Sequence, residues 1–502
     1  MQPTVIENPD VSSDRLAHGF KRTLFGFPPS FRRNSSQDKY GYLFATKSQS
    51  ATIAFSDANR QLLENLGRNM IDIVGSDDAP GFSTIDAGYT YFGQFVDHDL
   101  TFDIDSSTKK VQDARELINY RTPNLDLDSV YGDGPAVDVF MYDAQGLRFV
   151  LGNSNQFDLP RSTAGLGIIG DPRNDENLIV AQLHMSMLRF HNAVIDQLQQ
   201  ENQSAKNDEL FRLAQREVRR HYQWVVFHDY LRTIVGAELI EDVMTNGLKI
   251  FSPKKHPRFF MPVEFSAAAY RFGHSQIRDR YHFNSTFSNQ EFLNAFSFTK
   301  TPVPTSWNVH WPSFFGTENQ PAANKARKID TRVAMSMGNL PSAPGAPPNS
   351  IFSILSARNL IRGMALKVPT SQYVAKRMNV SLLTHDQLLS SPYQNPTPEQ
   401  EAQHQTTVQT LQSENSQLLR NTPLWYYILK EAEVLHGGNQ LGPVGGRIVA
   451  EVFMRLLMEN EDSFLNSNTW KPRFGAQGAD ASNYKIIDLL RFAGTYPTPG
   501  IS

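Results

Sequence analysis

The sequence predicts a mainly α protein with long irregular loops and few short strands. Three observations lead to this prediction. Apolar residues recur at helical spacing in many segments, strand-like patterns are short and scattered, and stretches rich in Pro, Gly and Asn separate the helical segments. The chain has 502 residues, of which 40% are hydrophobic and 20% charged. This composition is globular, and the length allows one large domain or about two to four ordinary ones.

The predicted elements follow one another along the chain. Residues 1–40 are polar and rich in Pro and Ser, which indicates an N-terminal arm before a domain over residues 41–502. Asp57 is the predicted N-cap of a first helix. A second helix is expected near 84–100, a loop-rich region over 107–165, and a long amphipathic helix from Glu176 to about Gln200. Further helical patterns cover residues 209–236 and 265–277 and, after a Pro/Gly/Asn-rich connection between about 283 and 350, residues 356–366, 397–419, 423–435 and 444–458.

Charge and composition exclude several classes of partner and cofactor. The formal net charge is −3 and no long Lys/Arg run is present, so nucleic acid and anionic membrane surfaces are not expected partners. No apolar run is long enough for a membrane span, and the N-terminus lacks the pattern of a secretory signal, so a soluble protein is expected, either cytoplasmic or exported without a signal peptide. The absence of cysteine excludes disulfides, thiolate metal sites and a cysteine nucleophile.

The stretch YFGQFVDHDL, residues 91–100, concentrates polar groups in an aromatic segment. On a helix, Gln94, Asp97 and His98 share one face, whereas Asp99 is turned away by about 100°. A satisfied polar patch is one interpretation of this pattern. Buried groups of this kind need partners, so a ligand, a metal or water is the other.

Three further segments carry candidate functional residues. GDPRNDENL places Arg173, Asp175 and Glu176 at the start of the long helix, where acids also complement the helix dipole. In AAAYRFGHSQIRDRY, His274 follows Arg271 by three residues in mostly apolar surroundings. In RTPNLDLDSVYG, oxygen-bearing residues alternate, which suits Ca²⁺ or a solvated acidic loop; they are Thr122, Asn124, Asp126 and Asp128.

Taken together, these segments resemble the animal-type haem peroxidase family of the peroxidase–cyclooxygenase superfamily, and within it the bacterial, cysteine-free branch. The matching pieces are GQFVDHDL, RTPNLDLDSVYG, GDPRNDENLIVAQLHMSMLRFHN, MPVEFSAAAYRFGHS, ARNLIRGMALKVPTSQ and LGPVGGRIVAE, in the family's order over residues 84–450. The resemblance implies a single large helical haem-peroxidase domain that binds haem b and Ca²⁺.

The resemblance also assigns roles on the peroxide side of the haem. His98 matches the distal histidine, Gln94 the distal glutamine and Arg173 the distal arginine. A histidine can take a proton from peroxide and return it, and a guanidinium can stabilise the charge on the departing oxygen. Asp97 and Glu176 match the two carboxylates that form ester bonds to the haem.

On the other side of the haem, His274 matches the proximal iron ligand and Arg271 lies at the cofactor. The family has an asparagine as the hydrogen-bond partner behind the proximal histidine, and Gln372 is expected in that role here. The family's third haem link uses a methionine where this chain has Asn177, so at most two esters are expected.

Calcium in the family is bound by the acid after the distal histidine and by the loop before VYG. The resemblance therefore implies a calcium site made of Asp99, Thr122, the carbonyl of Asn124, Asp126 and Asp128.

The expected activity is that of a peroxidase, which reduces hydrogen peroxide through a ferryl haem and oxidises a small organic or halide donor. Fatty-acid dioxygenases of the superfamily carry a radical-forming tyrosine three residues before the proximal histidine. Here that residue is Arg271, and Tyr270 is one position off, a rotation of about 100° on an α-helix. A dioxygenase and a noncatalytic haem- and calcium-stabilised binding or adhesion module are the alternatives. The oligomeric state and the reducing substrate are not readable from the sequence.

Overall fold

The structure is a computed structural model, and it describes residues 39–45, 51–73, 81–103, 107–152, 155–340, 353–413, 417–467, 469–476 and 481–497. The predicted arm over residues 1–40 lies almost entirely outside these ranges. Helices dominate the described chain, and buried residues from almost all of them form one continuous core. The predicted mainly α domain with few short strands is confirmed. Within the described ranges, every helix is too short or too polar to cross a membrane.

Fifteen α-helices are described. They are α1 Asp57–Asn69, α2 Gly88–Leu100, α3 Asp128–Tyr131, α4 Leu178–Glu201, α5 Asn207–Trp224, α6 Leu231–Val235, α7 Ala237–Asn246, α8 Val263–Ser266, α9 Leu355–Ala365, α10 Ser371–Met378, α11 His385–Leu388, α12 Pro398–Gln412, α13 Leu424–His436, α14 Pro443–Glu459 and α15 Ile486–Phe492.

The described strands are short and form three two-stranded sheets. The strands are β1 Tyr40–Gly41, β2 Phe82–Asp86, β3 Met261–Pro262, β4 Arg280–Tyr281, β5 Gln290–Glu291 and β6 Lys325–Arg327. Pair β1–β3 is parallel, with Tyr40 opposite Met261, whereas β2–β6 and β4–β5 are antiparallel.

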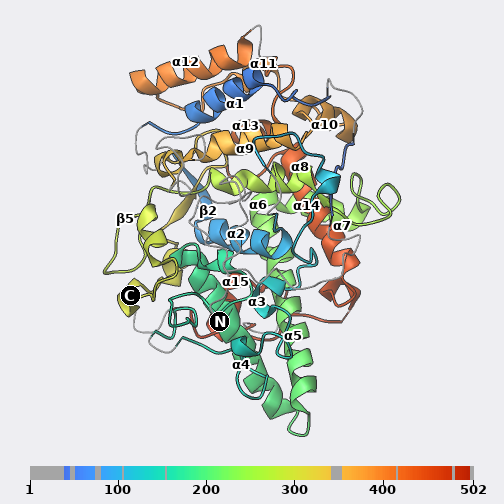
Figure 1. The fold of residues 1–502 in the computed structure, drawn as a ribbon, viewed down its shortest axis with the longest axis vertical. Coiled ribbons are helices and arrows are strands. Elements are labelled where there is room, and N and C mark those ends of the chain that lie inside the picture. Colours follow the sequence, from blue (N-terminus) through green and yellow to red (C-terminus); the bar gives the residue numbers. More distant parts are fainter. Residues whose placement is uncertain are drawn as a thin grey trace, which may run out of the picture.

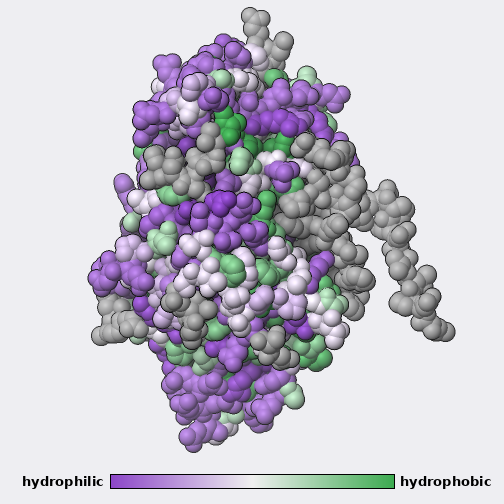
Figure 2. All heavy atoms as spheres, turned by 90° about the vertical axis from the view of Figure 1, so that its left-hand side faces the viewer, coloured by the Kyte–Doolittle hydropathy of each residue, from purple (hydrophilic) through white to green (hydrophobic). Residues whose placement is uncertain are grey.

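Helix α2 lies at the centre of the molecule (Figure 1). It contacts α4 and the 3₁₀-helix Ala269–His274, which in turn packs on α13 and α14. Helices α4 and α5 form a long antiparallel hairpin at one end, and α1, α9 and α12 pack together toward the other (Figure 1). This arrangement encloses α2 and the 3₁₀-helix, so the side chains between them are shielded from water. One face of the surface is mainly hydrophilic, with small scattered apolar areas (Figure 2).

Several predicted boundaries differ from the observed ones. The segment expected as helix from 84 begins as strand β2, because Phe82–Asp86 has the alternating burial of a half-buried strand and pairs with β6. Ser56, rather than Asp57, is the N-cap of α1, since its side chain accepts a hydrogen bond from the Asn59 amide. The helix expected over 265–277 is split into α8 and the 3₁₀-helix, because Ala268 leaves the helical conformation.

The long helix begins at Leu178, two residues later than predicted. Asn177 is its N-cap, and its side chain accepts a hydrogen bond from the Val180 amide. Arg173 and Asp175 lie in the preceding 3₁₀-helix Pro172–Asp175, and Glu176 follows it. Glu176 therefore lies in the turn between the 3₁₀-helix and the N-cap of α4, and not in α4 itself.

The contact between α1 and α9 gives a test of the fold. A Cβ on Gly67 in α1 would lie 2.4 Å from the Ala357 Cα in α9, and backbone cannot move aside cheaply. We expect Gly67→Ala to destabilise the protein by about 1–3 kcal/mol, because the overpacking outweighs the helix preference of alanine. Gly363→Ala in α9 is the control, since a Cβ there meets nothing within 4 Å. It should stabilise the protein by up to about 1 kcal/mol. Thermal unfolding midpoints that shift in the same direction for both variants would contradict this packing.

Candidate haem and calcium sites

A cavity lies between α2 and the 3₁₀-helix Ala269–His274. Its non-atom space amounts to about 890 Å³, including open solvent at its mouth. Helix α2 contributes Gln94 and Asp97 to its wall, the turn before α4 contributes Glu176, and the 3₁₀-helix contributes Arg271 and His274. The other end is apolar and is lined by Ile277, Phe292, Phe296, Met337, Leu340 and Leu355. Three sequence segments with candidate residues thus meet in one cavity.

His274 is held from behind by an amide that the sequence reasoning missed. The Asn359 Nδ2 lies 2.7 Å from the His274 Nδ1, and the Asn359 Oδ1 accepts a hydrogen bond from Arg271 at 3.5 Å. Burial, together with the guanidinium groups of Arg271, Arg358 and Arg362, holds the pKa of His274 well below its usual range. The imidazole is therefore neutral, as a metal ligand must be. With this amide orientation its Nδ1 accepts a hydrogen bond from Asn359 and its Nε2 carries the hydrogen, so binding of iron through Nε2 requires the Asn359 amide to turn by 180°.

Gln372 does not take the role expected for it. Its Nε2 donates to the Thr422 Oγ1 at 2.9 Å and to the Leu419 carbonyl at 3.2 Å, and its Oε1 accepts from the Thr422 amide at 2.8 Å. These bonds tie the start of α10 to the chain before α13, so the expectation of Gln372 as the partner of His274 is wrong. The sequence feature that could have indicated the true partner is Asn359, an amide side chain in the segment ARNLIRG.

His98 is fully buried and belongs to a chain of three side chains. Its Nδ1 lies 2.8 Å from the Asn174 Oδ1, and the Asn174 Nδ2 lies 2.9 Å from the Nδ1 of His184. With this amide orientation His98 donates through Nδ1, which leaves the lone pair on Nε2. Burial lowers the pKa of His184 to about 3, so its ring is neutral. Asn174 and His184 were not among the predicted site residues.

The structure separates residues that the sequence grouped together. Gln94 and Asp97 line the cavity, but His98 is not among the described residues of its wall. The amide oxygen of Gln94 accepts a hydrogen bond from the Asn177 Nδ2 at 3.3 Å. Asn177, at the position where the family has a methionine, therefore both caps α4 and orients Gln94, whose own amide donors remain available to a ligand.

Arg173 does not line the large cavity either. Its Nη2 donates to the Asp171 carboxylate at 2.7 Å and to the His98 carbonyl at 2.8 Å, and its guanidinium lies 4.5 Å from the centre of the Phe102 ring. Burial raises the pKa of Asp171, but Arg121 and Arg173 outweigh it, so that pKa lies well below its usual range. The guanidinium of Arg173, which was expected beside peroxide, is therefore paired with the buried carboxylate of Asp171.

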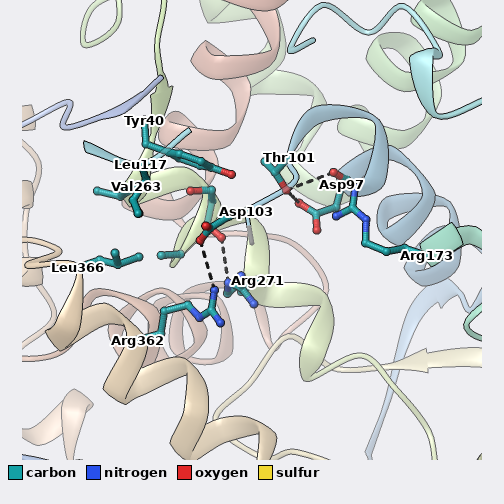
Figure 3. Close-up of a pocket in the computed structure, with 12 residues that line it drawn as sticks. Tyr40, Asp97, Thr101, Asp103, Leu117, Arg173, Val263, Arg271, Arg362 and Leu366 are labelled. Carbon is teal, nitrogen blue, oxygen red and sulfur yellow. Dashed lines mark hydrogen bonds and ion pairs between the residues drawn. The ribbon is translucent and has the colours of Figure 1, made fainter. Parts of the chain in front are cut away.

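A smaller pocket adjoins the cavity and shares Asp97 and Arg271 with it (Figure 3). Arg173 lies beside Asp97 and Thr101 at one side, and Asp103 lies next to Arg362 at the other, with 3.7 Å between the charged atoms. Burial raises the pKa of Asp97, and the two nearby guanidiniums of Arg271 and Arg173 oppose that rise. The pocket is therefore a cationic recess at the edge of the cavity.

The acidic cluster predicted for calcium forms behind α2. One carboxylate oxygen from each of Asp99, Asp126 and Asp128 lies within 4.8 Å of the others. Burial, and then the neighbouring carboxylates of Asp128 and Asp126, raise the pKa of Asp99 well above its usual range. Hard oxygen ligands at this density suit Ca²⁺.

The two other predicted calcium ligands are placed differently. The Thr122 amide donates to the Asp128 carboxylate at 3.0 Å, so this residue lies beside the cluster. The carbonyl of Asn124 instead accepts a hydrogen bond from the Asn460 Nδ2 at 2.8 Å.

Comparisons with known proteins agree with this arrangement. The animal haem peroxidase family model matches residues 102–475, a range that begins just after α2. Peroxidasin from Drosophila melanogaster is 30% identical over 194 residues, which cover 34% of this chain and 12% of that protein. The aligned part is thus a small share of this curated relative.

Solved structures share the fold over most of the chain. Peroxidase A from Dictyostelium discoideum superposes with a TM-score of 0.60 at 14% identity, covering 92% of this chain and 94% of that one. A fatty acid alpha-dioxygenase from Arabidopsis thaliana superposes with a TM-score of 0.59 at 14% identity, covering 89% and 75%. At this identity the likeness concerns the fold alone.

The contrast between Asn359 and Gln372 gives a test that needs no ligand. We expect Asn359→Ala to change the ¹⁵N chemical shifts of the His274 ring in the apoprotein, because the Nδ1 atom loses its amide partner and the tautomer balance changes. Gln372→Ala should leave those shifts unchanged, since its bonds lie between α10 and the chain before α13. If the Gln372 variant moved the His274 signals and the Asn359 variant did not, the assignment of the partner would be reversed.

Proposed function

Because the chain belongs to the animal haem peroxidase family, we propose that it binds haem b in the cavity between α2 and His274. We further propose that it reduces hydrogen peroxide and oxidises a small organic or halide donor. The observation that carries this proposal is the neutral imidazole of His274, in contact with Asn359 on the wall of a cavity that also presents Gln94, Asp97 and Glu176.

The residues around the cavity fit haem as well as its iron. Asp97 and Glu176 both line the cavity and are the carboxylates suited to ester bonds with the haem periphery. Arg271 lines both the cavity and the cationic recess, and Arg362 lies in the recess, so these two guanidiniums suit the two carboxylates of haem b. Asn177 replaces the residue needed for a third link.

Haem, when bound, supplies the iron that peroxide oxidises, and the chain supplies proton transfer and orientation. His98 is the proposed base, although it is not among the described residues of the cavity wall: Asn174 holds its Nδ1, which leaves the Nε2 lone pair to take a proton from peroxide and return it to the departing oxygen. Gln94 orients peroxide through the amide donors that Asn177 leaves available. Arg173 acts as a positioning residue, because it binds the His98 carbonyl and thereby fixes the end of α2.

One observation favours a fatty-acid dioxygenase as the second candidate. Tyr270 was expected to be rotated from the position of the radical-forming tyrosine, which Arg271 occupies, yet both Tyr270 and Arg271 line the cavity. The segment is a 3₁₀-helix, in which one residue corresponds to a rotation of about 120°, and the cavity wall nevertheless includes both side chains. A tyrosine on the cavity wall is what radical oxygenation of a fatty acid requires.

Two assays on the purified holoprotein separate these functions. We expect peroxide-dependent oxidation of guaiacol, and no oxygen uptake with linoleate beyond the blank. His274→Ala should lose the Soret band of ligated haem together with guaiacol oxidation, because no other described histidine lines the cavity. Oxygen uptake without guaiacol oxidation would favour the dioxygenase, and neither reaction would favour a noncatalytic module. An unchanged Soret band in the variant would refute His274 as the ligand.

We also propose that Asp99, Asp126 and Asp128 bind Ca²⁺. A ligand present at about 100 times its dissociation constant stabilises the folded state by about 2.7 kcal/mol, so calcium should raise the thermal unfolding midpoint. Asp126→Asn should remove most of this calcium-dependent rise. Asp138→Asn is the control, because Asp138 accepts a backbone hydrogen bond from Asp133 outside the cluster. Equal calcium responses in both variants would overturn the site.

A further inference from the structure

Three tyrosines form a continuous line from the cavity toward the surface. Tyr270 and Tyr230 both line the cavity, and their ring centres lie 6.5 Å apart. The Tyr230 ring stacks on Tyr89 at 6.4 Å with 26° between the ring planes. Tyr230 and Tyr270 are buried, whereas Tyr89 is partly exposed. Buried tyrosines usually serve packing, so a role beyond packing needs further features in the same place.

The backbone makes room for this line in two unusual ways. Residues Val225–Tyr230 form a π-helical segment between α5 and α6, a rare conformation that often marks functional sites. It ends at Tyr230. On the opposite side, a Cβ on Gly93 of α2 would lie 2.4 Å from the Tyr230 hydroxyl, so only glycine admits that hydroxyl. The Tyr270 hydroxyl donates to the Gly93 carbonyl at 3.3 Å. Two phenol groups therefore converge on one residue of the cavity wall.

The outer end of the line has its own proton acceptor. The Tyr89 hydroxyl donates to the Asp229 Oδ1 at 2.7 Å, and the Asp229 Oδ2 accepts a hydrogen bond from the Ile486 amide at 2.9 Å. Asp229 lies in the same π-helical segment as Tyr230. Burial raises the pKa of this carboxyl to about 6, so it is largely ionised at neutral pH and able to accept a proton. Oxidation of a phenol to a neutral radical requires such an acceptor.

We propose that Tyr270, Tyr230 and Tyr89 carry oxidising equivalents from the cavity to the outer edge of Tyr89, where phenolic donors too large to enter the cavity are oxidised. This inference rests on the proposed peroxidase function, which supplies hydrogen peroxide as the oxidant. Tyr89 loses one electron through Tyr230 and Tyr270 to the oxidised cofactor, and its hydroxyl proton passes to Asp229.

The donor then restores Tyr89. A phenol gives one electron to the Tyr89 radical, Asp229 returns its proton to Tyr89, and the phenol releases its own proton to solvent. One peroxide and two phenols thus yield two waters and two phenoxyl radicals, so electrons and protons balance. Small donors that enter the cavity do not need this route.

The test compares two donors on the holoprotein, guaiacol and tyramine coupled to dextran, with peroxide as the oxidant. In Tyr89→Phe we expect guaiacol oxidation to stay within about twofold of wild type and oxidation of the dextran-bound phenol to fall by about tenfold or more. Tyr393→Phe is the matched control, because Tyr393 also donates to an aspartate, Asp72 at 3.0 Å, but among the described residues its ring does not contact Tyr230 or Tyr270. That variant should oxidise both donors as wild type does.

A second measurement does not depend on turnover. A nitroso spin trap added with peroxide, followed by peptide mass spectrometry, should label Tyr89 in wild type. Labelling should fall in Asp229→Asn, which keeps a hydrogen-bond acceptor but removes the proton acceptor. Unchanged oxidation of the dextran-bound phenol by Tyr89→Phe, or a trap adduct absent from Tyr89 in an active wild type, would overturn the relay. A wild type that oxidises neither donor would overturn the proposed peroxidase function, and the relay with it.

Discussion

The burial of α2 is the constraint on which the rest of the structure depends. Ten of its thirteen residues are buried, and a buried polar group costs free energy unless it is paired. Successive side chains on a helix point about 100° apart, so each polar residue of α2 meets a different partner. Asp97 lines the cavity and the recess, His98 forms a hydrogen bond with Asn174, and Asp99 belongs to the acidic cluster. One helix thereby connects every part of the candidate site.

The proposed haem and calcium sites are consequently not independent. The carboxylate of Asp99 also accepts hydrogen bonds from the Leu127 amide and the Ser129 hydroxyl, so the loop before α3 is attached to the same turn of α2 that carries His98. Arg173 holds the His98 carbonyl from the other side. The position of the proposed base therefore depends on groups that do not contact the cavity.

The sequence predicted the helical class and brought the correct segments together. Helical spacing placed Gln94 and Asp97 on one face, and both line the cavity. It could not show the partners of the amides, since Asn174, Asn177 and Asn359 act through residues distant in sequence. Arg173 was expected at the cavity because it matches the family's distal arginine, but its guanidinium pairs with Asp171, two residues earlier. The sequence placed Tyr270 one position from that of the radical-forming tyrosine, but it could not show that the cavity wall includes both Tyr270 and Arg271.

Asn174 has a consequence for the protons of the site. Its amide joins two imidazoles, one through oxygen and one through nitrogen. If the amide turned by 180°, the His98 Nδ1 would face a donor and the His184 Nδ1 an acceptor, so both rings would have to exchange tautomers together. The two histidines therefore behave as a single element with two proton arrangements. A ring buried away from the cavity thus sets which nitrogen of His98 carries hydrogen.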